Sequence, residues 1–201
     1  MSETKISLSP EELSLAIDAS VILTKNAIIQ KTIKLFGQLQ EEQQKLVESN
    51  VADLPDELRK STSKITKGEY YKGLPYVVLD YPRLFEKKNI AAVRTMFWWG
   101  HFFSVTLHLS GSYKKRFEPN IVHSLDQLKQ NGFYFCIHDS PWEHDFDQTN
   151  YKSLNEFEQD ELIAAIADRD FIKLAFKWPV DRWNVASADL LHYFSILMKL
   201  M

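Results

Sequence analysis

The sequence predicts a single α+β domain, spanning residues 1–201, in which a mainly antiparallel sheet of about five strands packs against helices. Apolar residues recur at helical spacing near both ends of the chain, whereas β-branched and aromatic residues alternate in its central part. The predicted strands are clustered with few helices between them, which is typical of antiparallel sheets. A composition of 45% apolar and 25% charged residues is that of an ordinary globular protein.

The N-terminal part is predicted to be helical. Residues 9–12, SPEE, combine a capping hydroxyl, proline at the first helical position and acids near the positive end of the helix dipole. This pattern predicts a short helix over residues 10–19, followed by a long helix over residues 20–49. Residues 50–67 are polar, and we interpret them as a connection with one helical turn after Pro55.

A β-hairpin over residues 91–109 determines which side chains share a face. Gly100 can adopt positive φ without steric cost, so Gly100-His101 is interpreted as a two-residue turn in which Trp99 faces Phe102. Side chains alternate between the two sides of a strand, and a slip of one residue at the turn would exchange the sides. The side expected on the core carries Ala92, Arg94, Met96, Trp98, Phe103, Val105, Leu107 and Leu109. The opposite, mixed side carries Val93, Thr95, Phe97, Trp99, Phe102, Ser104, Thr106 and His108.

The remaining elements follow from the same patterns. Pro75 suits the first residue of a strand, and Pro82 is expected to limit its length. The chain is expected to end in a strongly apolar helix after Pro179. The other predicted strands cover residues 75–80, 133–138 and 171–178, and the other predicted helices cover residues 118–131 and 154–167.

The mixed side of the hairpin is the first candidate site. Aromatic rings with a few polar groups are typical of small-molecule pockets, although rings on strands also pack in cores. We expect a small apolar or aromatic ligand, or a protein partner, on this side. Arg94, on the apolar side, requires a buried acid such as Asp80, a bound anion or a place at the sheet edge. The candidate ligand-binding residues are Phe97, Trp99, Phe102, Thr106, His108 and Arg94.

The segment 138–147, HDSPWEHDFD, is the second candidate site. Imidazole and carboxylate groups are ligands of divalent metals, and we take His138, Glu143, His144 and Asp145 as candidate ligands. The spacing matches no established metal motif, and Asp-Ser-Pro is also ordinary turn chemistry. Apart from such a metal, no cofactor is expected.

Composition excludes several classes of protein. A net charge of −3 argues against nucleic-acid binding. The N-terminal residues lack the apolar segment of a signal peptide, and no apolar run approaches the ~20 residues of a membrane span. The single Cys136 cannot form an internal disulfide. We therefore expect a soluble, cytoplasmic protein.

Three functions remain open at this stage. The leading hypothesis is a non-catalytic binding module that uses the aromatic sheet face. The second is a metal-dependent hydrolase that uses the 138–147 loop and a metal-bound water. The third is a homodimeric structural or interaction protein without a ligand, paired through its apolar C-terminal helix. The sequence contains no nucleophile-elbow, P-loop or dinucleotide-binding motif, so it assigns no catalytic residue.

Overall fold

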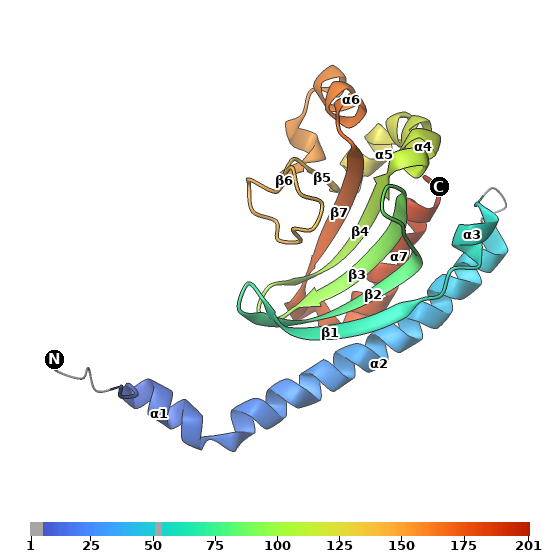
Figure 1. Ribbon diagram of the computed structural model, residues 1–201. Helices are drawn as coiled ribbons and strands as arrows, with labels where there is room; N and C mark the ends of the chain where they lie inside the picture. Colours follow the sequence, from blue (N-terminus) through green and yellow to red (C-terminus); the bar gives the residue numbers. More distant parts are fainter. Residues whose placement is uncertain (1–5, 51–53) are drawn as a thin grey trace.

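The computed structural model describes residues 6–50 and 54–201. Its described strands form one antiparallel sheet of seven strands in the order β1-β2-β3-β4-β7-β5-β6 (Figure 1). The α+β class and the antiparallel sheet are confirmed, with two strands more than the sequence predicted. The strands are β1 (Lys64–Tyr71), β2 (Leu74–Phe85), β3 (Ile90–Trp98), β4 (Phe102–Ser110), β5 (Tyr134–Cys136), β6 (Tyr151–Ser153) and β7 (Phe171–Pro179).

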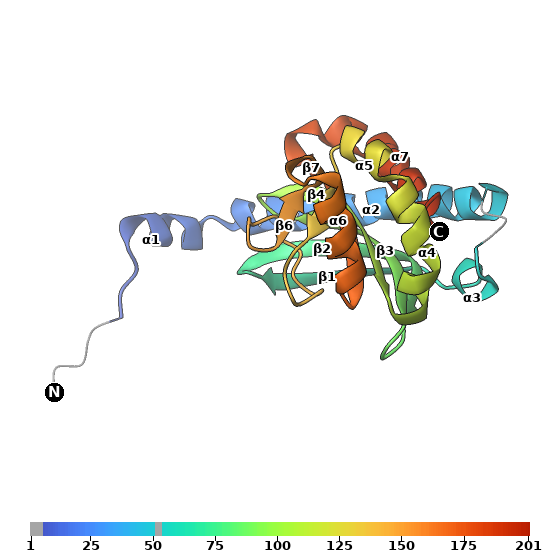
Figure 2. The same ribbon diagram turned by 90° about the horizontal axis from the view of Figure 1, so that it is seen from above.

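The long helix α2 and the last helix α7 cover one face of the sheet, which we call the helix face (Figures 1 and 2). The main hydrophobic core lies between this face and the helices. The opposite, open face is covered only in part, by the loop of residues 137–150. The α-helices are α1 (Pro10–Ile17), α2 (Ala19–Asn50), α3 (Asp56–Arg59), α4 (Gly111–His123), α5 (Leu125–Gln130), α6 (Gln159–Asp168) and α7 (Ala186–Met198). Two short 3₁₀ helices span Leu154–Glu156 and Val180–Val185.

The N-terminal helices follow the sequence prediction. The Ser9 hydroxyl accepts a hydrogen bond from the Glu12 amide, and the Glu12 carboxylate accepts one from the Ser9 amide. This reciprocal cap fixes the start of α1. The single helical turn expected after Pro55 is α3. No helix in the two described ranges has the length and hydropathy of a membrane span.

One turn and one proline account for the differences in the first strands. Strand β1 covers residues 64–71, although residues 64–67 were interpreted as part of the connection and no strand was predicted before residue 75. A turn at Lys72-Gly73, with positive φ at both residues, joins β1 to β2. Pro82 does not end β2, because it lies where the β2–β3 register shifts between Asp80 and Arg83. The strand therefore continues to Phe85.

Helix α4 also differs from the prediction, because it begins at Gly111 rather than Glu118 and contains Pro119.

The β3–β4 hairpin has a three-residue turn, Trp99 to His101, in place of the predicted two-residue turn. Trp98 pairs with Phe102, and the His101 amide donates to the Trp98 carbonyl at 3.1 Å. Gly100, the central residue of this turn, has a φ of +74°, a conformation that glycine adopts without steric cost. The predicted pairing of Trp99 with Phe102 is therefore wrong by one residue.

Because of this shift, each set of β3 side chains shares a face with the other set of β4 side chains than predicted. The helix face carries Ala91, Val93, Thr95 and Phe97 from β3 with Phe103, Val105, Leu107 and Leu109 from β4. The open face carries Ala92, Arg94, Met96 and Trp98 with Phe102, Ser104, Thr106 and His108. Each face thus combines half of the predicted core side with half of the predicted mixed side.

The apolar C-terminal helix is buried within its own chain. Leu190, Phe194 and Leu197 are inaccessible to solvent in the main core, and the last residues, Leu200 and Met201, are buried with them. The apolar side chains of α7 that suggested a homodimer are therefore packed against the core of their own chain.

The core position of Phe97 generates a prediction. Its ring is 2% exposed and lies against Phe103 and Trp183, so Phe97→Ala should lower the free energy of unfolding by about 3–5 kcal/mol. Urea denaturation measures this loss. The control Tyr70→Ala removes an exposed ring from β1 and should change stability by less than about 1 kcal/mol. A small effect at Phe97 would contradict the observed register.

Candidate functional site

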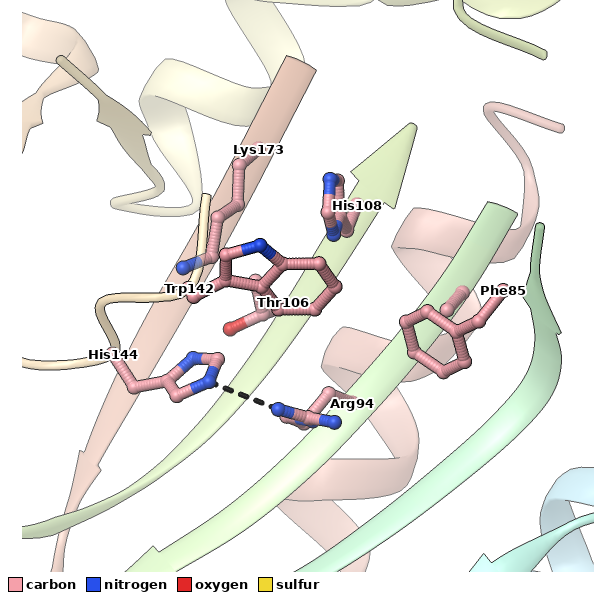
Figure 3. Close-up of a pocket in the computed structure, with 8 residues that line it drawn as sticks. Phe85, Arg94, Thr106, His108, Trp142, His144 and Lys173 are labelled. Carbon is pink, nitrogen blue, oxygen red and sulfur yellow. Dashed lines mark hydrogen bonds between the residues drawn. The ribbon is translucent and has the colours of Figure 1, made fainter. Parts of the chain in front are cut away.

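A cavity lies on the open face, between the sheet and the 137–150 loop (Figure 3). Its volume is about 10 Å³, which is room for about one water molecule. Four strands and the loop contribute its walls. The lining residues are Phe85 from β2, Ala92 and Arg94 from β3, Thr106 and His108 from β4, Lys173 from β7, and Trp142 and His144 from the loop.

Sheet register brings the polar groups of the cavity together. Arg94 lies opposite Thr106 across the β3–β4 ladder, and His108 lies opposite Lys173 across the β4–β7 ladder. Because directly opposed residues have side chains on the same face, these four groups converge without any contribution from loop geometry.

Arg94 forms an ion pair with Asp80. Its Nε donates to Asp80 Oδ1 at 2.7 Å and its Nη2 donates to Asp80 Oδ2 at 3.0 Å, which is the two-point pairing that guanidinium and carboxylate prefer. This pair explains how an arginine is accommodated on the inner part of the sheet.

The same guanidinium fixes the state of His144. Arg94 Nη1 lies 2.9 Å from His144 Nε2 (Figure 3). Arginine has only donors, so His144 Nε2 must accept, and the imidazole is neutral with its proton on Nδ1. Burial and the nearby cations Lys173 and Arg94 lower the pKa of His144 well below 6.5, in agreement with this geometry.

His108 points into the cavity with an unsatisfied ring nitrogen. The residue is 7% exposed, and its Nε2 is buried without a hydrogen-bond partner. The ring meets Trp142 and Phe171 edge to face, at centroid distances of 5.6 and 5.9 Å. Burial, with the charges of Lys173 and Arg94, lowers the pKa of His108 to about 3, so the ring is neutral at pH 7.

Lys173 is a buried cation without a carboxylate partner. It is 1% exposed, its ammonium donates to the backbone carbonyl of Glu143, and it lies 5.2 Å from the centre of the Tyr151 ring. In the described parts of the chain, no acid comes within ion-pair distance of it. Burial lowers the pKa of Lys173 to about 8, against an ordinary value of 10.5.

Trp142 closes the cavity from the solvent side. Its indole is 52% exposed and lies between the rings of His108 and Phe85. The loop around it is held at its start and in its middle: Arg169 donates to the carbonyls of Ile137 and His138, and the Tyr71 hydroxyl accepts from the amides of His144 and Asp145. The indole therefore covers the cavity from a firmly attached loop.

The structure does not gather the four candidate metal ligands into one set. His138 Nδ1 accepts from the Ser140 amide at 3.0 Å, within its own turn. His144 faces Arg94, Asp145 pairs with Lys72 at 2.6 Å, and Glu143 accepts from the Tyr71 hydroxyl. Across residues 6–50 and 54–201, no three His, Cys, Asp or Glu side chains are placed to hold a metal ion.

The candidate pocket residues divide between the two faces of the sheet. Arg94, Thr106 and His108 line the cavity, and Phe102 lies further along the open face beside Trp98 and Phe146. Phe97 and Trp99 lie on the helix face and pack against the main core. The cavity is also lined by four residues that the sequence did not indicate as pocket residues: Lys173, Trp142, Phe85 and Ala92.

Comparison with known proteins adds no relative. The chain matches no family model, no curated protein and no solved structure. By its own structure, the chain is an α+β protein whose sheet carries a small, partly charged cavity on its open face.

Because the His108 imidazole is buried, the free energy of unfolding should decrease at acidic pH. Below pH 6.5 the unfolded chain binds a proton at His108, whereas the folded chain does so only near pH 3, so stability falls as the pH falls. Between pH 7 and pH 5 this residue should account for a loss of about 2 kcal/mol. Urea denaturation at both pH values should show that loss reduced in His108→Phe and unchanged in His123→Gln, which alters an exposed imidazole.

The buried ammonium of Lys173 predicts an effect of the same sign at higher pH: stability rises as the pH rises. Below pH 8 the folded state holds a charge that burial disfavours, and this penalty is relieved as the pH rises from 8 to 10.5. Lys173→Met should therefore be more stable than the wild type at pH 7, and the difference should shrink by roughly 2 kcal/mol by pH 10. Lys177→Met, on the exposed part of the same strand face, is the control. Parallel profiles for Lys173→Met and the wild type would contradict this prediction.

Proposed function

We propose that this chain binds a small apolar or aromatic molecule in the cavity beneath Trp142. The observation that carries the proposal is the wall of the cavity: three aromatic or apolar side chains, Phe85, Ala92 and Trp142, face a small group of buried polar side chains. An apolar surface with a few convergent polar groups is the usual composition of a small-molecule site.

The ligand takes the place of the Trp142 indole. The present cavity has room for about one water molecule, so a larger molecule requires the indole to move outward. This ring is the half-exposed part of an otherwise attached loop, and no hydrogen bond to its side chain is found among the described residues. An aromatic ligand in its place keeps the ring contacts to Phe85 and His108.

The proposed binding activity requires neither a metal nor a second copy of the chain. We place it in the cytoplasm on the basis of Cys136, a free thiol that is fully buried and compatible with a reducing compartment.

The proposal is tested by titrating the protein with indole and with benzamide while the imidazole resonances are followed by NMR. Both probes should shift the resonances of His108 and His144, and leave that of the exposed His123 unchanged, because only the first two rings line the cavity. Trp142→Ala should bind indole at least about tenfold more tightly than the wild type, since no side chain then has to be displaced.

Two variants control for binding elsewhere. Ala92→Leu places a larger side chain in the cavity and should weaken binding of both probes. Trp99→Phe alters a ring on the helix face and should leave binding unchanged. The proposal is wrong if neither probe shifts His108 in the wild type, or if Ala92→Leu binds both probes as the wild type does.

A further inference from the structure

We infer that the molecule bound beneath Trp142 carries a carboxylate group, which pairs with the Lys173 ammonium and the His108 Nε2. This inference rests on the proposed binding function and adds to it the chemical class of the ligand. The balance of charge in the cavity, its free hydrogen-bond donors and its size each favour such a group.

The cavity has one positive charge in excess. Arg94 is neutralised by Asp80, and both imidazoles, of His108 and His144, are neutral. The ammonium of Lys173 remains, with the Glu143 carbonyl as its hydrogen-bond partner, the Tyr151 ring 5.2 Å away, and no carboxylate among the described residues within ion-pair distance. A buried charge without a counter-ion is strongly disfavoured, whereas an anion from the ligand would supply that counter-ion.

The acids at the edge of the cavity are engaged elsewhere. Asp145 pairs with Lys72 at 2.6 Å, and Glu143 Oε2 lies 3.2 Å from the Tyr71 hydroxyl and 3.9 Å from the Lys72 ammonium. These contacts leave Lys173 as the buried cation available to a ligand on this side of the sheet.

Donors are available at the point where the anion would lie. An ammonium has three N–H groups, and the Glu143 carbonyl accepts from one of them. Across the β4–β7 ladder, His108 Nε2 is buried without a partner and donates when the neutral ring carries its proton there. Two donors on directly opposed residues suit the two oxygens of one carboxylate.

Size and charge favour a carboxylate over a phosphate. The present space holds about one water molecule, so either group requires the Trp142 indole to move outward, and a planar carboxylate demands less room than a tetrahedral phosphate. A carboxylate also carries a single charge, which matches the one unpaired ammonium.

The test compares three probes that share a phenyl ring: benzoate, neutral benzamide and phenyl phosphate. Affinities are measured by NMR titration at constant pH 7 and ionic strength. Benzoate should bind the wild type at least about tenfold more tightly than benzamide, because a charge-assisted hydrogen bond is stronger than a neutral one. Phenyl phosphate should bind more weakly than benzoate.

Variants of Lys173 and His108, with Lys177 as control, test which residues cause the preference for benzoate over benzamide. Lys173→Met should reduce the preference for benzoate over benzamide to less than about threefold, since it removes the unpaired charge and retains the aliphatic stem. His108→Phe retains the ring contacts and removes Nε2, so it should weaken benzoate selectively. Lys177→Met, four residues further along β7 on the same face, should retain the wild-type preference.

The outcomes separate this inference from the proposed function. If benzamide binds in the cavity as tightly as benzoate, or if Lys173→Met retains the preference, the carboxylate is ruled out while the binding function stands. Tighter binding of phenyl phosphate would also overturn the carboxylate assignment. If none of the probes shifts the His108 resonance, the proposed function itself fails.

Discussion

The candidate site depends on the length of one turn. With three residues between Trp98 and Phe102, Arg94 lies opposite Thr106 on the open face, where Asp80 of the neighbouring strand can reach it. A two-residue turn would place Arg94 opposite Leu107, on the surface that the helices cover. The positive φ of Gly100 permits the observed turn, and the pairing of β4 with β7 then carries the same register on to Lys173.

The sequence was sufficient for the parts of the fold that depend on local patterns. The capping residues around Ser9, the helical spacing in α2 and the alternation in β7 each indicate one structure at one place. Gly100 indicated a turn correctly, but a glycine at positive φ suits turns of two and of three residues alike. The register, and with it the placement of Phe97 and Trp99, depends on packing that the local sequence does not contain.

Lys173 and Phe85 line the cavity for reasons that strand periodicity does not contain. Alternation in β7 places Lys173 and Lys177 on one side of the strand and predicts that side to be wet. In the structure Lys177 is exposed and Lys173 is buried, because the 137–150 loop covers one part of the face and leaves the other open. Phe85 was missed since Pro82 suggested an end to β2, although a register shift accommodates the proline within the strand. Coverage by a distant loop is a tertiary property, which strand periodicity cannot report.

A comparison of half-buried Arg94 with buried Lys173, both on the open face, shows why the unpaired cation indicates function. Arg94 and Lys173 lie under the same loop, yet Arg94 meets a carboxylate at two points and Lys173 meets a single carbonyl. Folding alone gives no advantage to an ammonium at that position, because an apolar side chain of similar length would fill the space without the penalty of a buried charge. A ligand anion would reverse this balance, since binding stabilises the folded state in proportion to the logarithm of ligand concentration over Kd. The same lysine that weakens the free protein would therefore strengthen the complex, and this difference between two states is what distinguishes a binding residue from a structural one.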